Sequence, residues 1–213
     1  TPGARYSSIG SRHAGAPGSQ WRDCVGALSL LKDRAGRRPL AQDRLGLRGA
    51  GKSTIGPALA TRLGVPFAEL DERIESAAGM PTAQIFELHG ERWFRRLERE
   101  TLARFLVERR RAVIATGGGI VTEPETFDLL RRHSFTVWLK ARPRDHWDRV
   151  VAQGDRRPMA HRSAAMDELK ALLAEREALY ARADLVVDTS ALEVEETVDR
   201  IEARLGGGGV ETA

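Results

Sequence analysis

Short apolar runs and longer amphipathic segments follow one another along most of the chain. The runs at residues 112–116, 135–139 and 185–188 are almost wholly apolar, which is typical of strands buried within a parallel sheet. Residues 65–70 predict one more short strand. Because helical patterns separate these runs, the chain predicts an α/β fold in three layers: a parallel sheet of about five strands with helices on both faces.

Residues that start and stop helices place several boundaries. The helix that follows the glycine-rich stretch near residue 50 should end at Gly64. Asp71 should cap a helix that begins at Glu72. A further helix, opened by Pro81, should stop at Gly90.

Residues 91–110 predict a long amphipathic helix. Its arginines alternate with Glu91, Glu98, Glu100 and Glu108, and a solvated face is expected for most of them. Its inward positions are Phe94, Leu97, Leu102, Phe105 and Leu106.

The start of the chain does not follow this pattern. Residues 1–20 are rich in Gly, Ser, Ala and Pro and predict disorder, whereas residues 21–34 favour one short helix. An organelle transit peptide is one interpretation; a linker or the remnant of a truncated upstream part is favoured, because no clear amphipathic helix is present and the chain does not begin with Met. We expect a poorly structured basic tail over residues 1–44, a folded domain over 45–205 and a flexible tail over 206–213.

Composition limits the classes of function. The net charge is +4, but residues 1–44 hold eight Lys or Arg against three Asp, so the remainder is nearly neutral and no nucleic-acid partner is expected. Cys24 is the only cysteine and the five His lack zinc-like spacing, which predicts neither a disulfide nor a structural metal. No apolar run approaches the roughly 18 residues that span a bilayer. We expect a soluble, cytoplasmic monomer without a membrane partner.

Residues 46–53 match the phosphate-binding pattern G-x-x-x-x-G-K-[ST]. In such a loop backbone N–H groups face a phosphate chain, Lys52 reaches the outer phosphates and the Ser53 hydroxyl can hold Mg²⁺. An ordinary glycine turn is the alternative, but a helix pattern follows Ser53 directly, and helix N-termini favour anions. The predicted ATP-binding residues of this segment are Gly46, Gly49, Ala50, Gly51, Lys52, Ser53 and Thr54.

A buried strand normally leads into a loop of this kind. Residues 40–45 are a poor candidate for that strand, because polar and charged residues interrupt the apolar run. The first strand is therefore either short and strained or partly lost from the sequence.

Phosphoryl transfer needs a carboxylate for the metal, a group that orients the acceptor and cations over the phosphate. The strand at residues 112–116 ends in Thr116, so no acidic residue stands there. Glu69 and Asp71 at the end of the preceding strand are the natural substitutes, since their side chains point to the same side of an extended segment. In the alternative interpretation Glu69 is a solvated charge and Asp71 only caps a helix.

At these residues the chain resembles shikimate kinases, over about residues 45–205. The motifs that carry the resemblance are Gly46 to Ser53, Phe67-Ala68-Glu69-Leu70-Asp71, Phe94-Arg95-Arg96-Leu97-Glu98, Gly117-Gly118-Gly119, Arg157-Pro158, and Arg176 four residues before Tyr180. The resemblance implies a P-loop NTPase fold like that of nucleoside monophosphate kinases, with a mobile lid over residues 153–164.

The resemblance also implies ATP-dependent phosphorylation of a shikimate hydroxyl. Asp71 would orient and deprotonate that hydroxyl, acting with Lys52 and with Arg157, which would sit on the lid and contact the ATP phosphates. Arg95 and Arg176 would clamp the substrate carboxylate, as guanidinium groups suit carboxylates. The backbone of Gly117, Gly118 and Gly119 would line the substrate pocket, because glycine permits close approach.

One residue departs from the family pattern. Shikimate kinases usually have Asp where this chain has Glu69, and that carboxylate supports Mg²⁺ either directly or through water. Glu is longer by one methylene, and Mg²⁺ tolerates little distortion of its octahedral shell. The departure predicts weakened catalysis.

A second resemblance supports a different function. The sequence of residues 46–50, 114–121 and 150–159 is similar to the shikimate-kinase-like half of bacterial benzoate-pathway repressors. In that family this half binds benzoyl-CoA and transmits a signal instead of phosphorylating. Residues 1–44 offer no DNA-reading domain to accompany it. The favoured function is therefore the kinase with ATP and Mg²⁺; the alternatives are a benzoyl-CoA sensor and a kinase of another small metabolite.

Overall fold

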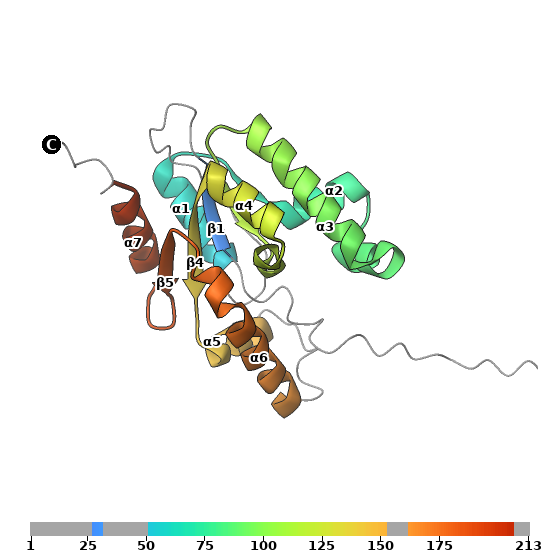
Figure 1. Ribbon diagram of the computed structural model, residues 1–213. Coiled ribbons are helices and arrows are strands. Elements are labelled where there is room, and N and C mark those ends of the chain that lie inside the picture. The colour runs from blue at the N-terminus through green and yellow to red at the C-terminus, as the bar shows by residue number, and fades with distance from the viewer. Residues whose placement is uncertain (1–26, 32–50, 153–161, 207–213) are drawn as a thin grey trace, which may run out of the picture.

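The computed structural model describes residues 27–31, 51–152 and 162–206 (Figure 1). A five-stranded sheet runs through the molecule in the order β2-β3-β1-β4-β5. The strands are β1 (Ala27–Leu31), β2 (Phe67–Glu69), β3 (Val113–Thr116), β4 (Ser134–Lys140) and β5 (Leu185–Asp188). The predicted α/β class and the number of strands are confirmed.

Helices cover the sheet on two sides. Helix α1 packs with α7 on one side, and α4 packs on β1 and β4 on the other (Figure 1). Helix α2 packs on β2, β3 and α3, and α3 also contacts α4. Helices α5 and α6 pack against each other near the end of β4. The helices are α1 (Lys52–Leu63), α2 (Leu70–Ala78), α3 (Thr82–Glu108), α4 (Pro124–His133), α5 (Pro143–Ala152), α6 (Arg162–Tyr180) and α7 (Val194–Gly206), with a short 3-10 helix η2 (Gly118–Thr122).

One apolar core joins these layers. Strand β3 is buried at every position, and β4 is buried at all but its last residue, as expected of strands with helices on both sides. The helices contribute buried apolar residues that face the sheet, including Ile55, Leu59, Phe105, Phe127, Val198 and Ile201. None of the helices in the described ranges is long and apolar enough to cross a membrane.

The central strand differs from the prediction. Strand β1 pairs antiparallel with both β3 and β4, so that Ala27 lies opposite Thr116 and Trp138. The helix predicted over residues 21–34 is therefore wrong for its described part. A short apolar run fits either pattern; here two buried neighbouring strands each require a hydrogen-bonding partner, and that requirement favours a strand.

The other four strands agree with the predicted parallel sheet. Strand β2 pairs parallel with β3, and β4 pairs parallel with β5. Since β1 is antiparallel to both β3 and β4, those two strands also run in the same direction. The carboxyl ends of all four strands therefore lie at one edge of the sheet, where α/β proteins bind ligands. The poor strand candidate at residues 40–45 lies outside the described residues.

Two predicted helix ends are confirmed and one cap is wrong. Gly64 ends α1 in the left-handed conformation, with φ of 64°. Gly90 interrupts α3 with φ of 76° and ψ of 173°. Asp71 does not cap α2: the helix begins at Leu70, directly after the extended Glu69, and Asp71 lies in its first turn. Strand β2 passes into α2 without an intervening turn, which moves the boundary upstream.

Candidate functional site

Asp71 lies against the glycine turn that follows β3. Strands β2 and β3 pair in parallel, with Glu69 opposite Ala115, so both strands end at the same edge of the sheet. A Cβ placed on Gly117 would lie 3.5 Å from Asp71 Oδ1. The structure therefore brings together two of the residues predicted to bind substrate.

Arg95 lies directly on Gly119. A Cβ placed on Gly119 would lie 2.3 Å from Arg95 Nη2 and 2.8 Å from Nη1, closer than real side-chain atoms approach. Only glycine leaves room for the guanidinium at this position. The contact explains the glycine at position 119, and it adds Arg95 to the group formed by Asp71 and the turn.

Carboxylates surround the Arg95 side chain. Arg95 Nη1 donates a hydrogen bond of 3.0 Å to Glu98 Oε2, and Nη2 lies 3.4 Å from Glu91 Oε1. Glu123, at the end of η2, lies 3.9 Å from Nε. Burial is the largest single influence and would lower the pKa of Arg95, but the charges of Glu98, Glu91 and Glu123 and the hydrogen bond to Glu98 together outweigh it, so the pKa is raised and the cation is held.

Glu98 is fully buried and is thus an exception to the solvated face expected for most charged residues of this helix. The buried guanidinium of Arg95 explains it, because an ion pair lowers the cost of burying a carboxylate. The signal in the sequence was the spacing of Arg95 and Glu98, which puts the two side chains on one helix face.

Helix α6 closes another side of the turn. Arg176 and Tyr180 are both buried, and their spacing of four residues places them on one face of the helix. The Tyr180 hydroxyl donates a hydrogen bond of 2.6 Å to the carbonyl oxygen of Gly118. Tyr180 was part of the sequence motif, but no role was predicted for it.

The start of α1 has the properties of an anion site. Gly51 precedes the helix with φ of 80°, Lys52 is fully buried, and the first turn contains no acidic residue. The free N–H groups and dipole at such a helix end favour phosphate. Ser53 and Thr54 are exposed beside it. The predicted residues Gly46, Gly49, Ala50 and Arg157 lie outside the described residues.

A cavity of about 470 Å³ adjoins this helix start and was not predicted from the sequence. It connects the phosphate-binding segment with the chain that leaves the carboxyl end of β5. Its lining consists of Gly51, Thr54, Ile55, residues 189–194 and Thr197. The polar residues Thr189 and Ser190 at a strand end were the signal that could have located it.

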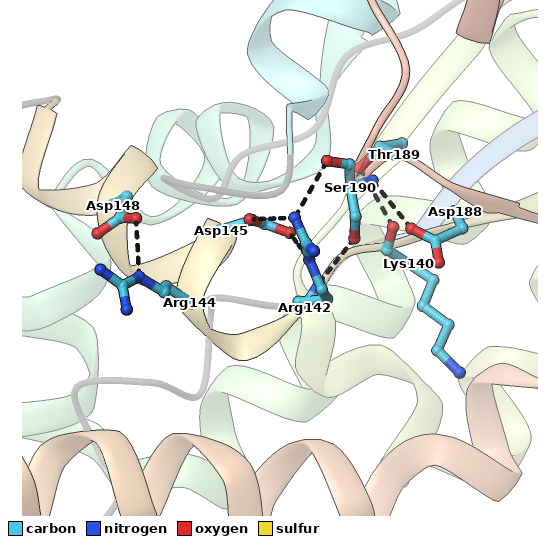
Figure 2. Close-up of polar contacts among 8 residues, drawn as sticks. All are labelled: Lys140, Arg142, Arg144, Asp145, Asp148, Asp188, Thr189 and Ser190. Atoms are coloured by element: carbon cyan, nitrogen blue, oxygen red, sulfur yellow. Dashed lines mark hydrogen bonds and ion pairs between the residues drawn. The ribbon is translucent and has the colours of Figure 1, made fainter.

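Hydrogen bonds hold one wall of this cavity, as Figure 2 shows. The Thr189 N–H donates to the Lys140 carbonyl oxygen over 2.8 Å, which ties the ends of β5 and β4 together. Ser190 Oγ accepts a bond of 3.0 Å from the Arg142 N–H, and the Ser190 N–H donates to Asp188 Oδ1 over 2.9 Å. The wall is therefore fixed by both neighbouring strands.

Two carboxyl groups next to this wall, Asp145 and Asp188, have lowered pKa values. The side-chain hydrogen bond from Arg142 is the main cause for Asp145, opposed by burial. For Asp188 the main cause is the hydrogen bond from the Ser190 backbone. Both groups therefore stay ionised to lower pH than ordinary aspartates.

Glu69 lies half-buried at the carboxyl end of β2, in extended conformation. Its carboxylate and the exposed Ser53 hydroxyl are oxygen ligands of the type that Mg²⁺ accepts, together with phosphate oxygens and water. Both groups are therefore of the chemical type that could hold this ion.

Comparisons with known proteins agree with this geometry. Residues 48–206 match the family model described as "Shikimate kinase". A shikimate kinase of Ruegeria pomeroyi is 41% identical over 162 residues, which cover 76% of this chain and 82% of that protein. One of Symbiobacterium thermophilum is 40% identical over 163 residues, which cover 76% and 93%.

Solved structures show the same relationship. Shikimate kinase from Acinetobacter baumannii in complex with shikimate is 27% identical, with a TM-score of 0.70 over 84% of this chain and 99% of that one. The enzyme from Bacteroides thetaiotaomicron is 30% identical, with a TM-score of 0.69 over 78% and 98%. The glycine turn, the arginines around it and the anion site before α1 thus have a common explanation, and the chain belongs to the shikimate kinase family.

Proposed function

We propose that this chain transfers the γ-phosphoryl group of ATP to a hydroxyl of shikimate. The observation that carries the proposal is the convergence of Asp71 and Arg95 on the glycine turn of residues 117–119, at the sheet edge that also holds the start of α1. One group there can accept a proton and another can bind a carboxylate. Shikimate offers both a hydroxyl and a carboxylate.

Asp71 orients the acceptor hydroxyl and takes its proton as the oxygen attacks the γ-phosphorus. Arg95 and Arg176 bind the substrate carboxylate, for which guanidinium groups offer paired donors. Because both arginines are largely buried, water competes little with the bonds that they make to a carboxylate. The substrate is thereby held with one hydroxyl towards the phosphate site.

The nucleotide binds with its phosphates at the start of α1. Lys52 and the N–H groups of that turn compensate the phosphate charge. The cavity bounded by Thr54 and residues 189–194 takes the nucleoside part, since it opens beside the phosphate site and has polar and apolar walls. Arg157, from the sequence motif, contributes a further cation.

Ser53 and Glu69 would hold Mg²⁺ together with phosphate oxygens and water. A bound Mg²⁺ neutralises charge on the phosphates and fixes their position. We also propose that the chain acts as a monomer in the cytoplasm, where its single cysteine stays reduced. The benzoyl-CoA sensor gains no support from the relatives and structures described above, all of which are named as shikimate kinases.

A coupled assay of ADP release with shikimate tests the proposal. The parent chain should turn over, and Lys52→Ala and Arg95→Ala should lose most of the activity. The matched control is Arg96→Ala, which removes an exposed arginine from the same helix turn and should leave the rate within about twofold. Absence of turnover with thermal stabilisation by benzoyl-CoA would instead establish the sensor.

A further inference from the structure

Tyr180 is a buried side chain for which the proposed mechanism has no role. Its ring is stacked on Trp138, with centroids 5.3 Å apart and planes inclined by 20°. Its hydroxyl donates to the Gly118 carbonyl oxygen over 2.6 Å. A fully buried hydroxyl that donates to the backbone of the substrate turn suggests a function in that turn.

Every carbonyl of the glycine turn is held by a different donor. The Gly117 carbonyl accepts from the Ile120 N–H over 3.1 Å. The Gly119 carbonyl accepts from Thr122 Oγ1 over 2.7 Å. These two donors are local to η2, whereas Tyr180 reaches the Gly118 carbonyl from helix α6, sixty-two residues away in the chain.

The direction of one carbonyl determines the direction of the next amide. A trans peptide is planar, and its C=O and N–H point opposite ways; the chain has no cis peptide in its described part. With the Gly118 carbonyl directed at Tyr180, the Gly119 N–H points away from α6. Glycine residues have no side chain to limit their backbone rotation, so an external contact is needed to hold this peptide.

We infer that Tyr180 is a positioning residue that orients the Gly119 amide beside Arg95 for the carboxylate of the substrate. Its place on α6 links two parts of the same site, since Arg176 lies one turn earlier on the same face. Tyr180 therefore holds the turn, and the turn with Arg95 and Arg176 forms the carboxylate site. The inference rests on the proposed function.

Tyr180→Phe tests it, because the variant keeps the ring and its stacking and removes only the hydroxyl. The KM for shikimate should rise about fivefold to tenfold, with kcat within about twofold and the KM for ATP unchanged. The matched control is Thr136→Val on β4, which removes a buried hydroxyl that is hydrogen-bonded to Asp184 and should leave both KM values unchanged. Equal rises in both KM values, or an unchanged KM for shikimate, would overturn the inference.

A spectroscopic measurement avoids any effect of the substitution on folding. The chain has two tyrosines, so 3-fluorotyrosine in a Tyr6→Phe background labels Tyr180 alone. Its ¹⁹F resonance should shift on saturation with shikimate, and Arg95→Ala should abolish the shift. If the resonance does not shift with shikimate although the chain phosphorylates it, the inference is overturned and the proposed function stands. A parent chain without turnover would refute both.

Discussion

The guanidinium of Arg95 occupies the space that a side chain on Gly119 would need, with Nη2 2.3 Å from the position of a Cβ. The arginine and the glycine are twenty-four residues apart and come from α3 and η2. Their contact joins the helix that carries Arg95 to the turn that lines the proposed substrate pocket.

Gly119→Ala should therefore displace Arg95. We expect kcat/KM for shikimate to fall on the order of 100-fold, because small displacements of a positioning group are costly. Binding of ADP, followed by calorimetry, should be unchanged.

Gly117→Ala is the matched control for that substitution. Gly117 has φ of −56°, which alanine adopts freely, and its Cβ would lie at an ordinary contact distance of 3.5 Å from Asp71. Its effect should be clearly smaller. Equal losses in kcat/KM in the two variants would show that displacement of Arg95 is not the cause of the loss.

Glu98→Gln should weaken both stability and substrate binding. The substitution removes the buried carboxylate that holds Arg95 Nη1, at a cost of about 3 kcal/mol in the free energy of unfolding. Urea unfolding measures that loss, and the KM for shikimate should rise in parallel.

Glu100→Gln removes an exposed carboxylate from the same helix and provides the comparison. Its effect on unfolding should stay below about 0.5 kcal/mol. If Glu98→Gln proves equally mild, the buried pair is not what holds Arg95.

Glu69→Asp should raise activity when Mg²⁺ is limiting. The shorter carboxylate leaves room for an undistorted octahedral shell at the end of β2. Titration of the rate with Mg²⁺ should give a lower half-saturating concentration. The control Glu72→Asp, an exposed change on α2, should leave that concentration unchanged. An unchanged or weaker Mg²⁺ response would mean that Glu69 does not limit metal binding.

Acid should weaken the wall of the nucleoside cavity. The folded-state pKa values of Asp145 and Asp188 lie below their ordinary values, so these groups stabilise the fold above the unfolded pKa of about 4. That contribution is lost as the pH falls through the folded pKa. Asp145→Asn should therefore destabilise the protein more at pH 7 than near pH 3.

Urea unfolding at the two pH values checks this prediction. Asp167→Asn, in an exposed ion pair on α6, should have little effect at either pH. A destabilisation by Asp145→Asn that is the same at both pH values would show that ionisation of Asp145 is not involved.

Local rules in the sequence were sufficient for many elements. The ends at Gly64 and Gly90 follow from backbone conformations that glycine adopts most easily, so they can be predicted one residue at a time. The buried strands β3 and β4 follow from unbroken apolar runs. The glycine turn and the arginine of the Phe94-Arg95 motif were recognised from motifs whose spacing is local.

Tertiary structure decided what depends on partners distant in the chain. Residues 27–31 form a strand because two buried strands need hydrogen bonds between them, and Glu98 is buried because Arg95 is buried beside it. The cavity beside α1 exists because the chain after β5 lies next to the start of that helix. A single segment encodes its own periodicity, but the free energy of pairing a strand or burying a charge belongs to both partners, and only the fold brings them together.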